Sequence, residues 1–166
     1  MRFLISLLLL ALCNPFAHAA EPFTNFNVVL LQPSDVLEQR VPSIDAMADY
    51  IKLVQSAVRD AVIASGSKQS VGGFIVVAVR PDLQSKVWLD FDTLLDLEAR
   101  RQIVSKVQAV KPFEARQGPV VFALKVGLWG GKESKRIAPA PAEWKSAVQG
   151  GTRLEVGELV EKIWNE

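Results

Sequence analysis

The sequence is poor in residues that carry reactive side chains. It contains one cysteine and one histidine, Cys13 and His18, and both lie close to the N-terminus. Once the N-terminal segment is removed, as expected below, the remaining chain has no thiolate, no imidazole and no disulfide. Zinc sites built from Cys and His, and catalysis by either residue, are then excluded. The sequence therefore predicts no cofactor, no metal site and no catalytic residue, and we expect that the protein is not an enzyme.

An excess of charge of one sign is also missing. The 19 Lys and Arg residues are balanced by 18 Asp and Glu residues, which leaves a net charge of +1 at pH 7. Binding to nucleic acid or to an anionic membrane surface needs a basic surplus on one face, so this balance argues against both. Beyond the N-terminal segment no apolar run approaches the ~18 residues of a membrane span. We therefore expect no stable membrane insertion after that segment is cleaved.

The N-terminal residues 1–19 have the pattern of a secretory signal peptide. Arg2 supplies the positive charge, an apolar run extends from Phe3 to Cys13, and Ala17-His18-Ala19 matches an A-x-A cleavage site. This order is typical of an exported protein that is cleaved near Ala19. A lipoprotein signal ending at Cys13 is the alternative, but the bulky Leu12 stands where a small residue is needed. The sequence predicts a periplasmic protein.

An amphipathic helix is expected to follow the first residues of the mature chain. Ser43 precedes it as a suitable N-cap, and Ser65-Gly66-Ser67 supplies a glycine stop. Its apolar residues recur at i, i+3, i+4 and i+7, which is the spacing of one helix face. These residues are Ile44, Met47, Ala48, Ile51, Val54, Val58, Ala61 and Val62.

The stretch from Val71 to Trp129 is expected to form the centre of the fold. It contains strands at 74–79, 86–91 and 119–126, and Arg80–Ser85 connects the first two as a hairpin. A helix is predicted at about Thr93–Val110, with Thr93 as its N-cap and Leu94 and Leu97 among its buried residues. Before this stretch, Val28–Leu31 predicts a short strand after an irregular lead-in at Glu21–Asn27.

These elements predict an α+β fold, a two-layer arrangement with a small, mainly antiparallel sheet. The core, at 42–129, has the order helix-strand-strand-helix-strand; residues 20–41 form the lead-in, and 130–166 a linker and C-terminal helical extension. Short helices are expected at Ala142–Gln149 and Glu155–Asn165, separated by Gly150-Gly151, with Thr152 capping the second. The strands at 74–79 and 119–126 are apolar on both faces. We therefore expect the amphipathic helices to cover one face of the sheet, and either the C-terminal helices or a partner to cover the other.

Catalytic motifs are present only in fragments. Ser65-Gly66-Ser67-Lys68 has the S-x-x-K spacing of penicillin-recognising enzymes, but their S-D-N and K-T-G motifs are missing, so a helix stop is the better interpretation. Gly130-Gly131-Lys132 lacks the first glycine of a P-loop and is interpreted as a turn leaving a strand. Asp90 and Asp92 share one strand face, which allows a carboxylate pair or a cation site. A solvated strand face with charge near a helix N-terminus is favoured for them.

The candidate binding residues lie on the third core strand and among the aromatic residues. Residues 119–126 are interpreted as an edge strand that can accept a partner strand. Aromatic residues dominate binding sites, yet a core role is favoured for the four tryptophans as a set, with Trp129 beside Gly130 as the main exception. The candidates are Val121, Phe122, Ala123, Lys125, Trp129 and Trp88.

The segment that joins the second helix to the third strand resembles part of a known family. It reads Lys111-Pro112-Phe113-Glu114-Ala115-Arg116-Gln117-Gly118-Pro119-Val120-Val121-Phe122. Together with the element order from about Pro42 to Trp129, it is similar to the TonB/TolA C-terminal domain. The family's Pro-rich spacer and its Ser-Ser-Gly turn have no counterpart here. The resemblance therefore implies the fold and a role in binding envelope proteins, rather than energy transduction.

Two functions remain open at this point. In the first, the chain is an exported, non-catalytic interaction module that contacts an envelope or periplasmic protein, or itself. In the second, it is a periplasmic inhibitor or immunity-type protein that neutralises a toxic effector. A small hydrolase is a third and weaker reading, because only carboxylates, serine and lysine would be available for catalysis.

Overall fold

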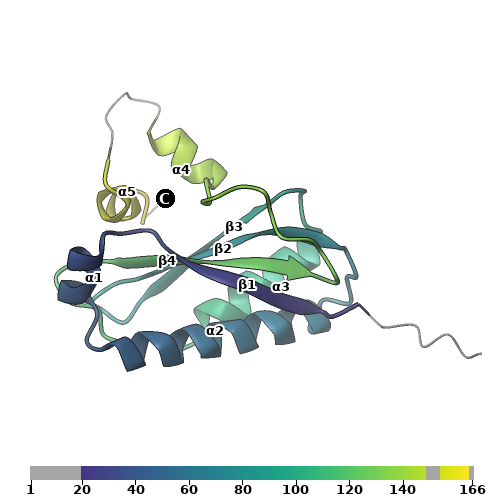
Figure 1. Ribbon diagram of the computed structural model, residues 1–166, viewed down its shortest axis with the longest axis horizontal. Coiled ribbons are helices and arrows are strands. Elements are labelled where there is room, and N and C mark those ends of the chain that lie inside the picture. The colour runs from purple at the N-terminus through teal and green to yellow at the C-terminus, as the bar shows by residue number, and fades with distance from the viewer. Residues whose placement is uncertain (1–19, 149–153, 165–166) are drawn as a thin grey trace, which may run out of the picture.

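The computed structural model describes residues 20–148 and 154–164 (Figure 1). Over these ranges the chain forms strands and helices in the following order. The elements are β1 (Phe23–Leu30), α1 (Ser34–Arg40), α2 (Ile44–Ala64), β2 (Val71–Val79), β3 (Ser85–Phe91), α3 (Leu97–Gln108), β4 (Val120–Leu128), α4 (Ala142–Ala147) and α5 (Val156–Lys162).

The four strands form one open sheet in the order β1-β4-β2-β3, and every neighbouring pair is antiparallel. The predicted α+β class is confirmed. β2 and β4 occupy the centre, where β2 is buried along its whole length and β4 at every position except Lys125. β1 and β3 are the two edges, and β1 lies at the front of the view in Figure 1.

Helices α2 and α3 cover one face of the sheet. α2 starts at Ser43, whose Oγ accepts a hydrogen bond from the Ala46 N–H at 3.1 Å, and Gly66 follows its end with φ +68°. Both ends were predicted, because a serine cap and a glycine stop act locally. The buried stripe of α2 packs against the apolar residues of the sheet that point the same way. That stripe is Tyr50, Val54, Val58, Ala61 and Val62.

Helix α3 is shorter than predicted. Its N-cap is Asp96, whose Oδ1 accepts from the Ala99 N–H at 2.9 Å, and not Thr93. Leu94 and Leu97 are 79% and 62% exposed, so the prediction that both are buried is wrong. Asp is a strong N-cap residue, and its position lets the helix present Ala99, Ile103 and Val107 to the core instead.

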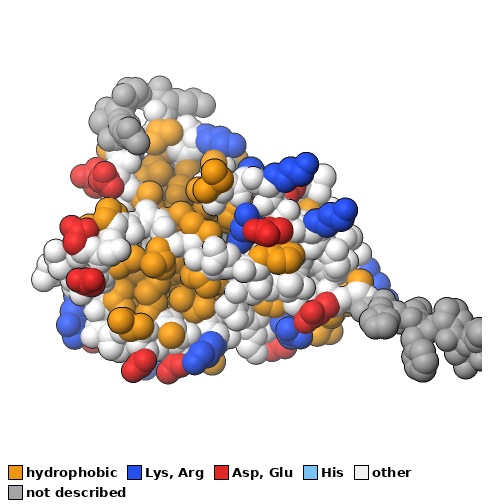
Figure 2. Space-filling model, in the orientation of Figure 1, with side chains coloured by type: hydrophobic (Ala, Val, Ile, Leu, Met, Phe, Trp, Pro, Cys, Tyr) orange, Lys and Arg blue, Asp and Glu red, His pale blue; other side chains and the backbone are white. Residues whose placement is uncertain are grey.

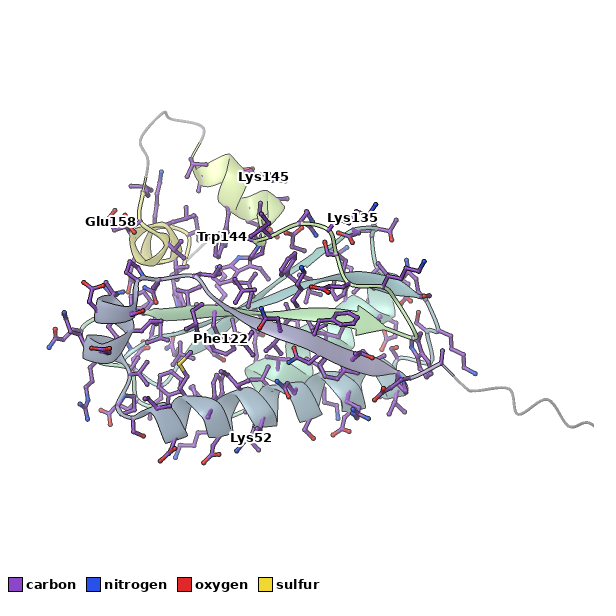
Figure 3. The ribbon with its side chains drawn as sticks, in the orientation of Figure 1. Lys52, Phe122, Lys135, Trp144, Lys145 and Glu158 are labelled. Carbon is purple, nitrogen blue, oxygen red and sulfur yellow. The ribbon has the colours of Figure 1, made fainter. Side chains whose placement is uncertain are left out.

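Helices α4 and α5 cover the opposite face, which decides between the two covers that the sequence left open. Their buried residues are Trp144, Leu159, Val160 and Ile163, which pack against Phe74, Val76, Val121 and Ala123 of the sheet. In Figure 3 the Trp144 side chain points from α4 toward the sheet. Glu155 is the N-cap of α5, and Glu158 completes a capping box with it. The predicted cap Thr152 and the predicted break at Gly150-Gly151 lie outside the described residues.

The lead-in at 20–41 is more ordered than predicted. β1 begins at Phe23 rather than Val28, and it runs antiparallel along β4. The register shifts between Asn25 and Asn27, which marks a β-bulge. A bulge and two asparagines interrupt the alternation that identifies a strand in sequence, so only its apolar end was recognised. Helix α1 was not predicted at all.

Candidate functional site

The structure places the predicted docking strand in the middle of the sheet. Phe122 of β4 pairs with Leu30 of β1 on one side and with Val77 of β2 on the other. Val121, Phe122 and Ala123 are 0% exposed. Interpreting 119–126 as an edge strand was therefore wrong, because the unrecognised strand β1 occupies the edge beside it. An apolar two-sided strand is what a central position requires.

The other predicted binding residues are also engaged inside the protein. Lys125 Nζ forms an ion pair with Glu133 at 2.7 Å. Trp88 is 5% exposed and meets Trp144 edge to face, with ring centroids 5.6 Å apart, as expected for core tryptophans. Trp129 is only partly buried, and its backbone has φ +47°, a value that is rare outside glycine. Trp129 packs against the core on the α2 side, and Lys68 Nζ lies 5.9 Å from the centre of its ring.

Asp90 and Asp92 are partners of one arginine. Arg136 lies 2.5 Å from Asp90 Oδ2 and 3.1 Å from Asp92 Oδ1. Ser134 Oγ donates to Asp92 Oδ1 at 2.8 Å, and the Ala140 N–H donates to Asp90 Oδ2 at 2.6 Å. The two carboxylates therefore hold residues 130–141, called here the connecting segment, against β3. Neither a solvated strand face nor an acid–base pair describes them.

Close backbone packing explains why glycine stands at position 72 of β2 and at position 131 of the connecting segment. A Cβ placed on Gly72 of β2 would lie 1.9 Å from the Lys132 carbonyl oxygen, and one placed on Gly131 would lie 2.2 Å from the Val71 carbonyl oxygen. The chain can cross the end of the sheet only because neither position carries a side chain. Gly130-Gly131-Lys132 is thus a turn that leaves β4, as predicted.

Within residues 20–148 and 154–164, two side chains have a clearly shifted pKa, and each shift has a structural cause. Burial raises the pKa of the Tyr50 hydroxyl, which sits edge-on to the rings of Phe113 and Phe122. The hydrogen bond from the Ala99 N–H lowers the pKa of Asp96, which is the N-cap of α3. In the described part of the chain, no group of three or more His, Cys, Asp and Glu side chains is placed to hold a metal ion.

No strand among the described residues pairs with the outer edge of β1, and this edge is the first part of the site. Leu31 donates its N–H to the Val121 carbonyl oxygen at 3.3 Å. Because backbone groups alternate in direction along a strand, those of Val28 and Leu30 point away from β4. Asn27 Oδ1 accepts from the Val28 N–H at 2.8 Å and so caps part of this edge. Phe23–Leu30 contains no charged residue.

An apolar groove beside β1 is the second part of the site. Its open volume is about 510 Å³, and it lies between the end of β1, α1 and the first turns of α2. Leu30 and Ile44 on its rim are 53% and 86% exposed. Figure 2 shows apolar side chains gathered on this face, on both sides of the white band of β1 backbone. The apolar walls include Leu30, Leu37, Val41, Ile44, Met47 and Ile51.

The opposite edge strand, β3, is protected against pairing with a further strand. Lys86 lies within β3, and its Nζ donates to the carbonyl oxygens of Ile163 at 2.7 Å and Trp164 at 2.9 Å. Asp90 of the same strand is bound by Arg136. Charged side chains and covering elements are the usual protection of an edge strand against further pairing. β1 lacks the charges, so it is the edge that is open to a partner strand.

Comparisons of the chain with protein-family models, with curated proteins and with solved structures find no match. The resemblance to the TonB/TolA C-terminal domain therefore stays a prediction. In the residues that the structure describes, no helix is long and apolar enough to cross a membrane. Function has to be inferred from the site, which consists of the β1 edge and the apolar groove.

Proposed function

We propose that this chain is an exported, non-catalytic protein-interaction module that binds an extended segment of its partner along β1. The observation that carries the proposal is an uncharged edge strand lying next to an apolar groove. In strand addition, main-chain hydrogen bonds provide affinity, and the side chains at alternate positions provide specificity.

The two parts of the site suit one ligand shape. An added strand would bond to the outward backbone groups of Val28 and Leu30, and Asn27 would release the Val28 N–H. Every second side chain of that strand would then point toward the groove between Leu30 and Ile44. Covering an exposed Leu or Ile side chain fully contributes about 1.5–3 kcal/mol. An apolar residue at alternate positions is therefore the feature expected in the partner.

Export is the second component of the proposal. It rests on Arg2, the apolar run Phe3–Cys13 and the Ala17-His18-Ala19 site, which lie outside the described residues. The partner is accordingly sought among envelope and periplasmic proteins, including a second copy of this chain.

The proposal is tested by affinity capture from periplasmic extract with paired variants. Leu30→Lys places a charge at the groove, and Val28→Pro removes one outward N–H without removing a bond to β4. Both variants are expected to lose a partner that the wild type captures. Leu83→Lys is the matched control, because Leu83 is a similarly exposed leucine (45%) in the β2–β3 hairpin, away from the groove.

The test depends on whether the two β1 variants capture less of the partner than the wild type does. Equal capture by the wild type, Leu30→Lys and Val28→Pro, with folds unchanged by circular dichroism, would contradict the proposal. Capture of a toxic enzyme through the same edge would instead support the alternative, a periplasmic inhibitor.

A further inference from the structure

We infer that the segment that docks on β1 runs antiparallel to it and carries a lysine or arginine two positions before its first apolar residue. The basic side chain reaches Glu38 of α1, and the apolar side chain enters the groove beside Leu30. The inference rests on the proposed function, because it uses the same edge and the same groove. It adds the direction of the partner segment and the pattern of its side chains.

The position of the groove determines which side chains of the partner can enter it. Val28 packs with the core on the α2 side of the sheet, whereas Val29 and Leu31 pack with the core on the other side. Leu30 lines the groove, so the residues of β1 with outward backbone groups are also those that face α2. In an antiparallel pair, residues that lie opposite each other share a face of the sheet. The partner residues opposite Leu30 and Val28 therefore point toward α2, the first of them into the groove.

The groove is negatively charged at the end where β1 leads into α1. Among the described residues that line it, Glu38 is the only one with a charge. Two further carboxylates, Asp35 and Asp45, lie in the first turns of α1 and α2, next to the lining residues Ser34 and Ile44. Figure 2 shows acidic side chains over α1, beside the apolar patch. A site lined by charge of one sign attracts a ligand group of the opposite sign, here a cation.

The protein does not neutralise this charge itself. Across residues 20–148 and 154–164, none of these three carboxylates takes part in an ion pair. Arg40, the basic residue of α1, is engaged elsewhere, since its Nη1 donates to the Pro119 carbonyl oxygen at 2.9 Å. The N-terminus of α2 has a partial positive charge that favours an anion, but Asp45 in its first turn offsets it.

The position of Glu38 also determines the order of the partner's residues. Along β1 the chain passes from Val28 to Leu30 and then enters α1, so Glu38 lies beyond the Leu30 end of the strand. An antiparallel segment passes this end first, and its side chains share a face at every second position. The residue two positions before the one opposite Leu30 is therefore on the groove side, near α1. Antiparallel pairing is also the more stable kind, and it is the kind found throughout this sheet.

Short synthetic peptides test the pattern. The parent peptide has lysine, leucine and valine at alternate positions in that order, with threonine at the other positions and a fluorophore for anisotropy. It is expected to bind the wild type. Replacing its lysine by threonine should weaken binding by up to about fivefold, and replacing it by glutamate should weaken binding further. A peptide of the same composition in the reverse order should also bind more weakly than the parent.

Methylation of the peptide backbone tests strand pairing. An N-methyl group on the leucine removes the N–H that the Leu30 carbonyl oxygen is expected to accept, so binding should be lost. The matched control has the N-methyl group on the threonine that follows the leucine. Its N–H points away from β1, because successive backbone groups of a strand point to opposite sides, and its binding should match that of the parent.

Charge reversal at Glu38 tests the contact from the side of the protein. Glu38→Lys is expected to bind the glutamate peptide more tightly than the lysine peptide, which reverses the preference of the wild type. Glu143→Lys is the matched control, because Glu143 is an exposed glutamate on α4, on the other face of the sheet. It should keep the wild-type preference. Added salt should reduce the preference in both proteins, since the contact is exposed.

The inference is overturned if the parent peptide does not bind, or if the wild type binds it no more tightly than the glutamate or reversed peptide. An unchanged preference in Glu38→Lys, or equal binding of the two N-methylated peptides, would also overturn it. The proposed function is tested separately, because the capture of a periplasmic protein that Leu30→Lys loses does not depend on a basic residue in that protein.

Discussion

Arg136 binds Asp90 across 46 residues of chain, with its Nη1 at 2.5 Å from Asp90 Oδ2 and its Nη2 at 2.7 Å from the Asp90 carbonyl oxygen. The Asp90 side chain is only 13% exposed, and the guanidinium also lies 5.2 Å from the centre of the Phe74 ring. This contact fixes the connecting segment to the edge strand β3. It thereby positions α4, which follows directly, over the second face of the sheet.

Replacing Arg136 should loosen this attachment. Arg136→Met is expected to lower the free energy of unfolding by about 1–3 kcal/mol, because Asp90 loses a charge-assisted partner in a largely buried position. Arg101→Met is the matched control, since its ion pair with Glu98 is exposed and should contribute less than about 1 kcal/mol. Urea denaturation measures both. Equal effects of the two substitutions would show that the Asp90 contact has no special role.

A methyl group at Gly72 should separate the connecting segment from the sheet. Its Cβ would lie 1.9 Å from the Lys132 carbonyl oxygen, so Gly72→Ala is expected to cost about 3 kcal/mol or more. Gly66→Ala is the contrasting variant, because its Cβ meets nothing within 4 Å and only the positive φ opposes it, at about 1 kcal/mol. Thermal unfolding followed by circular dichroism distinguishes the two. A smaller loss at Gly72 than at Gly66 would contradict the close approach.

The N-cap of α3 should make a pH-dependent contribution. The folded-state pKa of Asp96 lies below its ordinary value of 3.8. Its stabilisation is therefore fully present above that value and is lost as the pH falls through the folded pKa. Asp96→Ala is expected to cost about 0.5–2 kcal/mol at neutral pH, with the difference from the wild type shrinking in acid. Urea titrations at a series of pH values measure this.

Thr93→Ala is the control for that cap, because Thr93 is the N-cap that local spacing predicts and the structure does not use. Its effect should stay within about 0.5 kcal/mol at every pH. A larger loss at Thr93 than at Asp96 would mean that α3 begins earlier than Leu97.

Removing a phenylalanine ring should cost more stability on the central strand β4 than on the edge strand β1. Phe122→Ala on β4 is expected to cost about 3–5 kcal/mol, because it leaves a cavity between the sheet and α2, where the Phe122 ring centre lies 6.2 Å from that of Tyr50. Figure 3 labels Phe122. Phe26→Ala on β1 removes the same ring from a side chain that is 39% exposed and should cost about 1 kcal/mol or less. Equal costs in denaturant titrations would be inconsistent with the central position of β4.

Part of the fold was predictable because its signals are local. The cap at Ser43, the stop at Gly66 and the apolar stripe of α2 each depend on residues within a few positions of one another. The alternation around Trp88 likewise placed it on the face opposite Val87 and Leu89. The two-sided apolar strands also required cover on both faces, and the structure supplies it.

The candidate site was not predictable from the sequence, because it depends on which strand lies next to which. The sequence of β4 shows that it is buried on both faces, yet pairing on both edges depends on β1, a strand that its bulge and its asparagines conceal. Likewise, nothing in the residues that flank Asp90 or Arg136 in the sequence indicates that these two side chains form an ion pair.

By itself, then, the sequence determined the α+β class, the ends of α2 and the absence of cysteine and histidine from the described residues, since composition and short-range spacing are sufficient for these. Only the tertiary structure decided that β1 rather than β4 is the free edge, and that the apolar groove lies beside it. Strand order is a long-range property, set by the burial of whole strand faces and the pairing of backbone groups that are distant along the chain.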